Sequence, residues 1–175
     1  MKTKKQAFKA AVFTALTVIT AALIFFFSAQ AGEESASFSN GITRQIFNLF
    51  PWVSELPPEV YEAKFYEWHT FVRMMGHCFE FFTLSVFASL MWKFWDIGWP
   101  SLIGFITSAL YAISDEIHQA FVPGRAAEIT DVLVDCLGAF VGAFIIYLII
   151  NAKRSRERKK NNNYVKQILQ NKESE

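Results

Sequence analysis

Four apolar stretches dominate the pattern of hydrophobic and polar positions along the chain. They cover about residues 7–27, 71–92, 99–121 and 127–150, and each approaches or reaches the roughly 20 residues that a helix needs to cross a bilayer. Because hydrocarbon offers no partner to free backbone N–H and C=O groups, each crossing is expected to be helical. The pattern predicts an all-α, polytopic membrane bundle with four transmembrane helices within residues 1–150.

The first stretch also shares features with a secretory signal. MKTKK precedes it, and the small residues Ala29 and Ala31 follow it. Its apolar run extends over about 18 residues, which is longer than the roughly 7–15 residues of a signal core. We therefore expect a membrane helix that is retained.

Basic residues flank the apolar stretches at both ends of the chain. Lys2, Lys4 and Lys5 precede the first stretch, and a basic run follows the last: Lys153, Arg154, Arg156, Arg158, Lys159 and Lys160. Because Lys and Arg accumulate on the cytoplasmic side of a membrane, both termini are expected to be cytoplasmic, which needs an even number of crossings. The prediction is a multi-pass protein of the cell membrane, with a basic cytoplasmic tail at 151–175.

The segment at about residues 28–70 is then outside the cell, and it is not featureless. Apolar residues at helical spacing predict an amphipathic helix over 37–50, and 59–73 is expected to form a second helix that leads into the membrane. Pro51 and the pair Pro57-Pro58 separate the two. Both helices are expected to lie on the membrane surface or to cap the bundle.

Composition agrees with a membrane protein. Hydrophobic residues make up 53% of the chain, and 19 of them are Phe, whereas the net charge of +1 points to no nucleic acid partner. The only cysteines, Cys78 and Cys136, fall inside apolar stretches. They are expected to be buried free thiols rather than parts of a disulfide framework.

Ionisable residues of three predicted crossings fall at one depth, near the outer face. Those of the second and third crossings repeat the same i, i+4, i+7 spacing along one helix face: Arg73, His77, Glu80, and Tyr111, Asp115, His118. Those of the fourth crossing form a stripe that continues into small residues: Glu128, Asp131, Asp135, Gly138 and Gly142. Such charges normally face a bundle interior or water, and a Gly-x-x-x-Gly spacing lets a neighbouring helix approach closely. We expect a shared polar pocket between the second, third and fourth crossings that opens outward.

Two short segments add to this pocket. Pro123 and Gly124 predict a tight reversal that brings Arg125 over its mouth, and the end of the first crossing adds a further wall. Adjacent residues cannot share one helix face, so only Asp115 of the pair Asp115-Glu116 needs to point inward. The predicted ligand-binding residues are Ser28, Gln30, Arg73, His77, Glu80, Glu116, Gln119, Arg125, Asp131 and Asp135.

Four kinds of chemistry are open to these residues. They are an ion-pair network that holds the bundle, an anion or lipid head-group site, a metal site, and acid–base catalysis by Asp115 and His118. No cofactor is predicted, although a carboxylate and an imidazole at i, i+3 on two helices keep a divalent metal among the alternatives. The candidate metal ligands are His77, Glu80, Asp115 and His118.

The segment DEIHQAFVPGRAAEITDVLVDCLGAFVG (115–142) resembles the signature region of VanZ-like membrane proteins. That signature has an Asp-Glu-x-x-Gln run, a Pro-Gly-Arg turn, and then an Asp in a helix of small residues. The Phe27-Ser28-x-Gln30 segment and the face that carries Arg73 and His77 also match it. The resemblance covers about residues 10–150, and many family members carry Asn where this chain has Asp135.

The resemblance implies an envelope function rather than a defined reaction. The founding member of the family is associated with low-level resistance to teicoplanin in Gram-positive bacteria. The leading hypothesis is therefore a protein that lowers susceptibility to teicoplanin-type lipoglycopeptides. Its pocket would bind or modify a lipid-linked cell-wall component, or exclude the lipid-anchored drug, with membrane lipids as its surroundings.

Two further functions remain alternatives. One is a membrane enzyme, a hydrolase or transferase that acts on a lipid-linked envelope substrate through Asp115 or His118. The other is a small transporter, which would need an oligomer because four helices are few for a conduit. The residues do not decide whether the protein is an enzyme.

Overall fold

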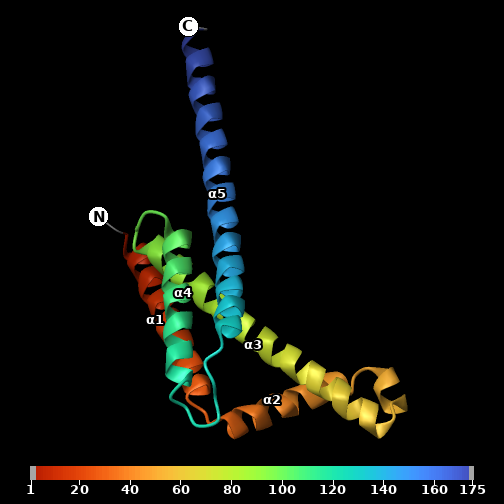
Figure 1. Ribbon diagram of the computed structural model, residues 1–175. Helices are drawn as coiled ribbons and strands as arrows, with labels where there is room; N and C mark the ends of the chain where they lie inside the picture. Colours follow the sequence, from red (N-terminus) through yellow and green to blue (C-terminus); the bar gives the residue numbers. More distant parts are fainter. Residues whose placement is uncertain (1–2, 174–175) are drawn as a thin grey trace.

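The computed structural model describes residues 3–173, and within this range its regular secondary structure is entirely helical (Figure 1). It forms five α-helices and one 3-10 helix: α1 (Lys4–Ser28), α2 (Gly32–Phe47), η1 (Pro51–Glu55), α3 (Pro58–Phe94), α4 (Pro100–Gln119) and α5 (Ile129–Glu173). The predicted all-α fold is confirmed.

Three of the described helices are long and apolar enough to cross a membrane. They are α1, α3 and the part of α5 from Ile129 to Asn171. The predicted crossing at 99–121 corresponds to α4, which is not among them because its last turns carry a run of polar and charged residues, Ser114, Asp115, Glu116, His118 and Gln119. Length and composition thus support a multi-pass helical membrane protein with three candidate spans.

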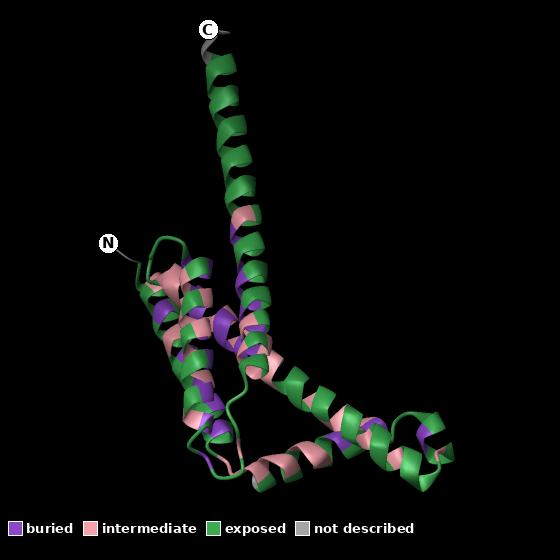
Figure 2. Ribbon diagram, viewed as in Figure 1, coloured by how far each residue is buried: buried purple, intermediate pink, exposed green. Residues whose placement is uncertain are grey.

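The second half of α3 is the centre of the bundle. It contacts α1, α4 and α5, and the core lies where these four helices meet. Figure 2 shows the buried residues concentrated there, whereas the far part of α5 is exposed. The fully buried side chains of this core are Ile24, Phe81, Leu84, Ala112 and Ala139. Many large apolar side chains on the outer surfaces of these helices stay exposed, as expected where lipid is the solvent.

Two glycines of α5 allow close helix packing in the bundle. A side chain at Gly138 would collide with the backbone carbonyl of Cys78, and one at Gly142 would collide with that of Phe82. The predicted role of the Gly-x-x-x-Gly spacing is therefore confirmed: it lets α5 lie directly against the backbone of α3. Both cysteines are free thiols, although they are half-buried rather than fully buried.

The first half of α3 projects from the bundle together with α2 and η1 (Figure 1). This arm has a small aromatic core around Phe47, which is 0% exposed and packs against Trp52, Phe65 and Trp68. α2 runs from the end of the bundle out to this arm, so that its first turns border the site described below (Figure 1).

Three element boundaries differ from the sequence prediction. The amphipathic helix begins at Gly32 rather than at residue 37, and the segments 59–73 and 71–92 form the single helix α3. The last crossing continues without a break through the basic tail to Glu173. No proline interrupts α3 after its first turn or α5 anywhere, so nothing in either segment forces a helix to end.

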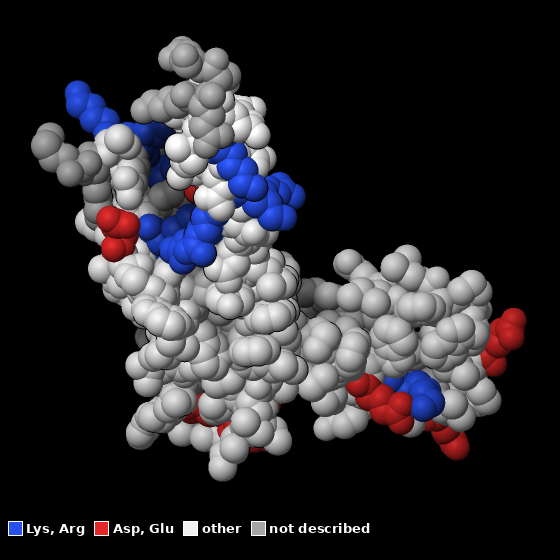
Figure 3. Space-filling view, turned by 90° about the horizontal axis from the view of Figure 1, so that it is seen from above, with Lys and Arg blue, Asp and Glu red and all other residues white. Residues whose placement is uncertain are grey.

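Charge is distributed unevenly over the molecule. Figure 3 shows Lys and Arg gathered around α5 and the beginning of α1, and mainly Asp and Glu on the projecting arm. The basic residues thus surround the end of the bundle from which α5 extends.

Candidate functional site

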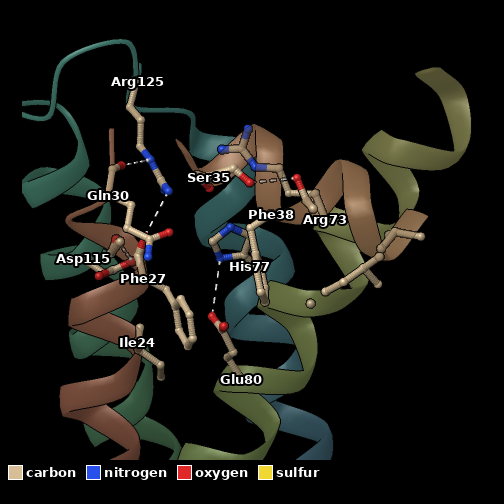
Figure 4. A pocket seen from close by; sticks show the side chains of 15 residues that line it. Ile24, Phe27, Gln30, Ser35, Phe38, Arg73, His77, Glu80, Asp115 and Arg125 are labelled. Atoms are coloured by element: carbon tan, nitrogen blue, oxygen red, sulfur yellow. Dashed lines mark hydrogen bonds and ion pairs between the residues drawn. The ribbon is translucent and has the colours of Figure 1, made fainter. Parts of the chain in front are cut away.

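A partly open cavity of about 230 Å³ lies where the end of α1 meets α2 and α3 (Figure 4). We call it the main cavity. Its polar lining includes Ser28, Gln30, Arg73, His77, Glu80, Asp115 and Arg125. The pocket was predicted between α3, α4 and α5, with the end of α1 as a further wall. The main cavity is lined by α1, α2 and α3, to which α4 adds Asp115 and the following loop adds Arg125, and α5 does not line it.

The cavity takes this position because the α4–α5 loop packs against the start of α2. The Gly32 N–H donates to the Pro123 carbonyl at 3.1 Å. A Cβ at Gly32 would collide with the carbonyl of Gly124, whose φ of +75° suits the tight reversal. Glycines at both positions therefore let α2 turn away from α1 directly at the loop.

Asp115 is the buried acceptor that joins α4 to α1. It is 4% exposed, and its Oδ2 accepts hydrogen bonds from the Ser28 hydroxyl and from the Gln119 side-chain amide, both at 2.8 Å. Nearby, the Tyr111 hydroxyl donates to the Ala21 carbonyl at 2.7 Å. A carboxylate with two such donors is well satisfied despite its burial.

Arg125 extends this network over the end of α1. Its guanidinium donates to the Phe27 carbonyl at 3.1 Å, to the Gln30 carbonyl at 3.1 Å and to the Gln119 side-chain oxygen at 3.0 Å. Burial lowers the pKa of Arg125 from its ordinary value, and the positive charge of Arg73 adds to this effect. The two guanidinium groups are therefore electrostatically coupled across the main cavity.

Arg73 and His77 also line a second cavity, which we call the side cavity. It has a volume of about 470 Å³, and it is bounded by α3, by Glu128 at the end of the α4–α5 loop and by the beginning of α5, including Asp131. The predicted site residues that line a cavity are thus distributed over two cavities, and Arg73 and His77 belong to both. Glu116, Gln119 and Asp135 line neither.

His77 is held between two carboxylates. Its Nδ1 lies 3.9 Å from Glu80 Oε2 and 4.0 Å from Asp135 Oδ1, distances too long for hydrogen bonds. Asp135 is 1% exposed, and both the imidazole Nδ1 and Asp135 Oδ1 are buried without a partner. An imidazole flanked by two acids can take up and release a proton, so this trio is the best placed acid–base group of the site.

The sequence predicted that only Asp115 of the pair Asp115-Glu116 needs to point inward. Both are buried, because they face different neighbours: Asp115 contacts α1, and Glu116 accepts a hydrogen bond from the backbone N–H of Glu128. Two faces of α4 near its end are therefore covered by other parts of the chain, while the face of Ile113 and Ile117 stays exposed.

His118 lies apart from both cavities, stacked on Phe25 with ring centroids 4.7 Å apart. Among residues 3–173, no three His, Cys, Asp or Glu side chains are close enough together to hold a metal ion. The four candidate ligands, His77, Glu80, Asp115 and His118, are accordingly not gathered into one cluster.

The main cavity also has an apolar wall that the sequence did not predict. Phe38 and Ile42 of α2 face Phe27 of α1 and Val72 of α3, and the Phe27 and Phe38 rings stack with centroids 6.0 Å apart. The residues of α2 that line the cavity are spaced i, i+3, i+4, i+7: Ser35, Phe38, Ser39 and Ile42. This periodicity is visible in the sequence, but nothing in it shows that the face packs beside the end of α1.

Together these features define a multi-pass helical membrane protein with an amphipathic cavity at the end of the bundle where α1 and α4 finish. The chain belongs to the VanZ/LLP1 family, whose sequence profile matches residues 13–151. No curated protein and no solved structure matches it. The matched segment includes every predicted site residue from Ser28 to Asp135.

Proposed function

We propose that this VanZ/LLP1 protein lowers the susceptibility of a Gram-positive bacterium to teicoplanin-type lipoglycopeptides by means of the main cavity. One observation carries the proposal. The cavity combines an apolar wall with two arginines and two carboxylates, and it lies at the end of the bundle opposite the basic chain ends. Such a cavity suits an amphipathic ligand, such as a lipid-linked cell-wall component or the acyl chain of the drug.

The proposal requires that the cavity face outward, which follows if α4 is a fourth crossing and both termini are cytoplasmic. α4 is 20 residues long, so it meets the length of a crossing. The two acids at its polar end have partners: Asp115 accepts from Ser28 and Gln119, and Glu116 accepts from a backbone N–H of the α4–α5 loop. Buried charges with partners of this kind are tolerated in a membrane bundle.

Cysteine labelling tests this topology. In a chain whose own cysteines are replaced by Ser, we expect Ala126→Cys to react with a membrane-impermeant maleimide on intact cells. Ile97→Cys and Ser155→Cys, both exposed positions, should react only after lysis. Labelling of Ala126→Cys and Ile97→Cys from the same side would show that α4 does not cross the membrane.

Susceptibility measurements test the function. Expressed in a teicoplanin-sensitive Gram-positive host, the wild type is expected to raise the inhibitory concentration of teicoplanin several-fold and to leave that of vancomycin unchanged. His77→Ala should abolish the effect, because His77 lines both cavities. His118→Ala is the matched control, since it removes an imidazole that lines neither. Unchanged susceptibility in cells that contain correctly inserted wild type would refute the proposal.

A membrane enzyme that acts on a lipid-linked substrate is the second candidate, and the position of His77 between Glu80 and Asp135 favours it. The same strains distinguish the two functions. An envelope lipid that changes with the wild type and not with His77→Ala, measured by mass spectrometry, would indicate turnover. An unchanged lipid profile together with protection would indicate binding alone.

A further inference from the structure

We propose that the main cavity binds the phosphate-bearing head group of an anionic membrane lipid, with the phosphate at Arg73 and the lipid chain against the apolar wall. The inference names the ligand class of the cavity described above, and it rests on the proposed function only for the outward orientation of that cavity.

Arg73 is the side chain that points to an anion. It lies on a candidate membrane-spanning helix, is exposed, and lines both cavities. Within residues 3–173 its guanidinium forms no hydrogen bond and no ion pair, whereas Lys64 on the same helix pairs with Glu67 at 2.8 Å. A guanidinium offers five N–H donors in a planar fork that fits two phosphate oxygens. At the edge of a membrane, such a free group is an unused binding site.

The other charges of the cavity already have neighbours. Asp115 accepts from Ser28 and Gln119, and Glu80 lies beside His77. Arg125 donates to two backbone carbonyls and an amide oxygen, and the acids Asp115, Glu116 and Glu80 offset its charge. The donors in the cavity that stay open to an anion are therefore those of Arg73.

The apolar wall indicates that the anion carries a chain. Phe38 is 59% exposed and Ile42 is 39% exposed, although both border the cavity. With Phe27 and Val72 they form an apolar surface next to Arg73 (Figure 4). A free phosphate ion bound at Arg73 would leave this surface in contact with water. Covering it with hydrocarbon is favourable in proportion to the apolar area buried. A ligand that carries both a phosphate group and a hydrocarbon chain is an anionic phospholipid.

Native mass spectrometry of the full-length protein tests this inference. The protein is reconstituted in nanodiscs of phosphatidylcholine that contain equal minor amounts of phosphatidylglycerol and of diacylglycerol. The wild type is expected to retain phosphatidylglycerol at least about tenfold over diacylglycerol, since a hydrogen bond to a charged group contributes on that scale. Arg73→Gln should lose about tenfold of this retention, and Arg73→Lys should lose less. Arg44→Gln, on the exposed surface of α2, should bind like the wild type.

Any of the following three results would overturn the proposal. Equal retention of phosphatidylglycerol by the wild type and Arg73→Gln would show that Arg73 does not bind the lipid. Equal retention of phosphatidylcholine and phosphatidylglycerol would show that negative charge is not recognised. Displacement of the lipid by inorganic phosphate would identify a site for the free ion. Arg73 is exposed and has no hydrogen-bond or ion-pair partner in the described part of the chain. An unchanged unfolding midpoint of Arg73→Gln is therefore expected, and it verifies that the variant is folded.

The lipid experiment and the susceptibility experiment can fail separately. If lipid binding depends on Arg73 and the wild type does not protect cells, the inference stands and the proposed function fails. If the wild type protects cells and retains no anionic lipid, the function stands and the head-group site is excluded.

Discussion

Gly138→Ala is expected to destabilise the protein by about 2 kcal/mol, although alanine is the better helix former. The added methyl group would meet the backbone carbonyl of Cys78 on α3, and a backbone atom cannot move aside as the end of a flexible side chain can. α5 must therefore shift away from α3 and lose packing along the central contact of the bundle. The unfolding midpoint of the protein purified in detergent measures the effect.

Gly41→Ala is the matched control for this change. Gly41 lies on α2, and a Cβ there would meet nothing within 4 Å. The same substitution should therefore stabilise the protein by roughly 0.5–1 kcal/mol through the lower entropy of the unfolded chain. If Gly138→Ala were as stable as Gly41→Ala, the close approach of α3 and α5 described above would be wrong.

Arg125→Ala is expected to cost about 3 kcal/mol and to release the α4–α5 loop from the end of α1. The change removes the guanidinium donor from the Gln30 carbonyl, from the Gln119 side-chain oxygen and from the Phe27 carbonyl, which keeps only the Gln30 N–H at 3.4 Å. Hydrogen bonds to a charged group each contribute about 1.5–3 kcal/mol, and water that replaces the guanidinium offsets part of this loss. The unfolding midpoint measures the cost, and faster amide hydrogen exchange at the start of α2 and in the loop should accompany it.

Arg44→Ala provides the comparison for this prediction. Arg44 lies on the exposed surface of α2, with its guanidinium 5.4 Å from the centre of the Phe65 ring. An exposed cation–π contact contributes about 0.5–1 kcal/mol, so its loss should change the midpoint little. Equal destabilisation by the two substitutions would contradict the anchoring role of Arg125. Arg125→Lys should fall between them, because a single ammonium group cannot reach all three acceptors.

The elements of the fold were largely predictable, because apolar stretches of about 20 residues admit little besides helices in a membrane. The small-residue packing of α5 was predictable for a similar reason, since Gly138 and Gly142 repeat on one helix face. The helix boundaries were harder to predict. The sequence pattern predicted two helices over 59–92, whereas the structure has one, because a helix continues wherever no residue breaks it.

The composition of the site was predictable only in part. Arg73, His77 and Glu80 follow one another along a helix face, and that spacing depends on local geometry alone. The arrangement of α2 was not predictable, because it depends on the contact between Gly32 and Gly124, which are far apart in the sequence. The positions of Phe38 and Ile42 in the cavity wall were therefore not predicted.

The sequence by itself determined the helical class, the family signature and the set of polar residues, because these depend on hydropathy, spacing and residue type within short segments. The tertiary structure decided which of those residues meet. It placed Asp115 against Ser28 and Arg125 over the end of α1, and it set His118 apart. Within residues 3–173 it left Arg73 without a hydrogen-bond or ion-pair partner. The physical reason is that hydrogen bonds between distant segments depend on how whole helices pack, and periodicity along one helix carries no information about the helix opposite.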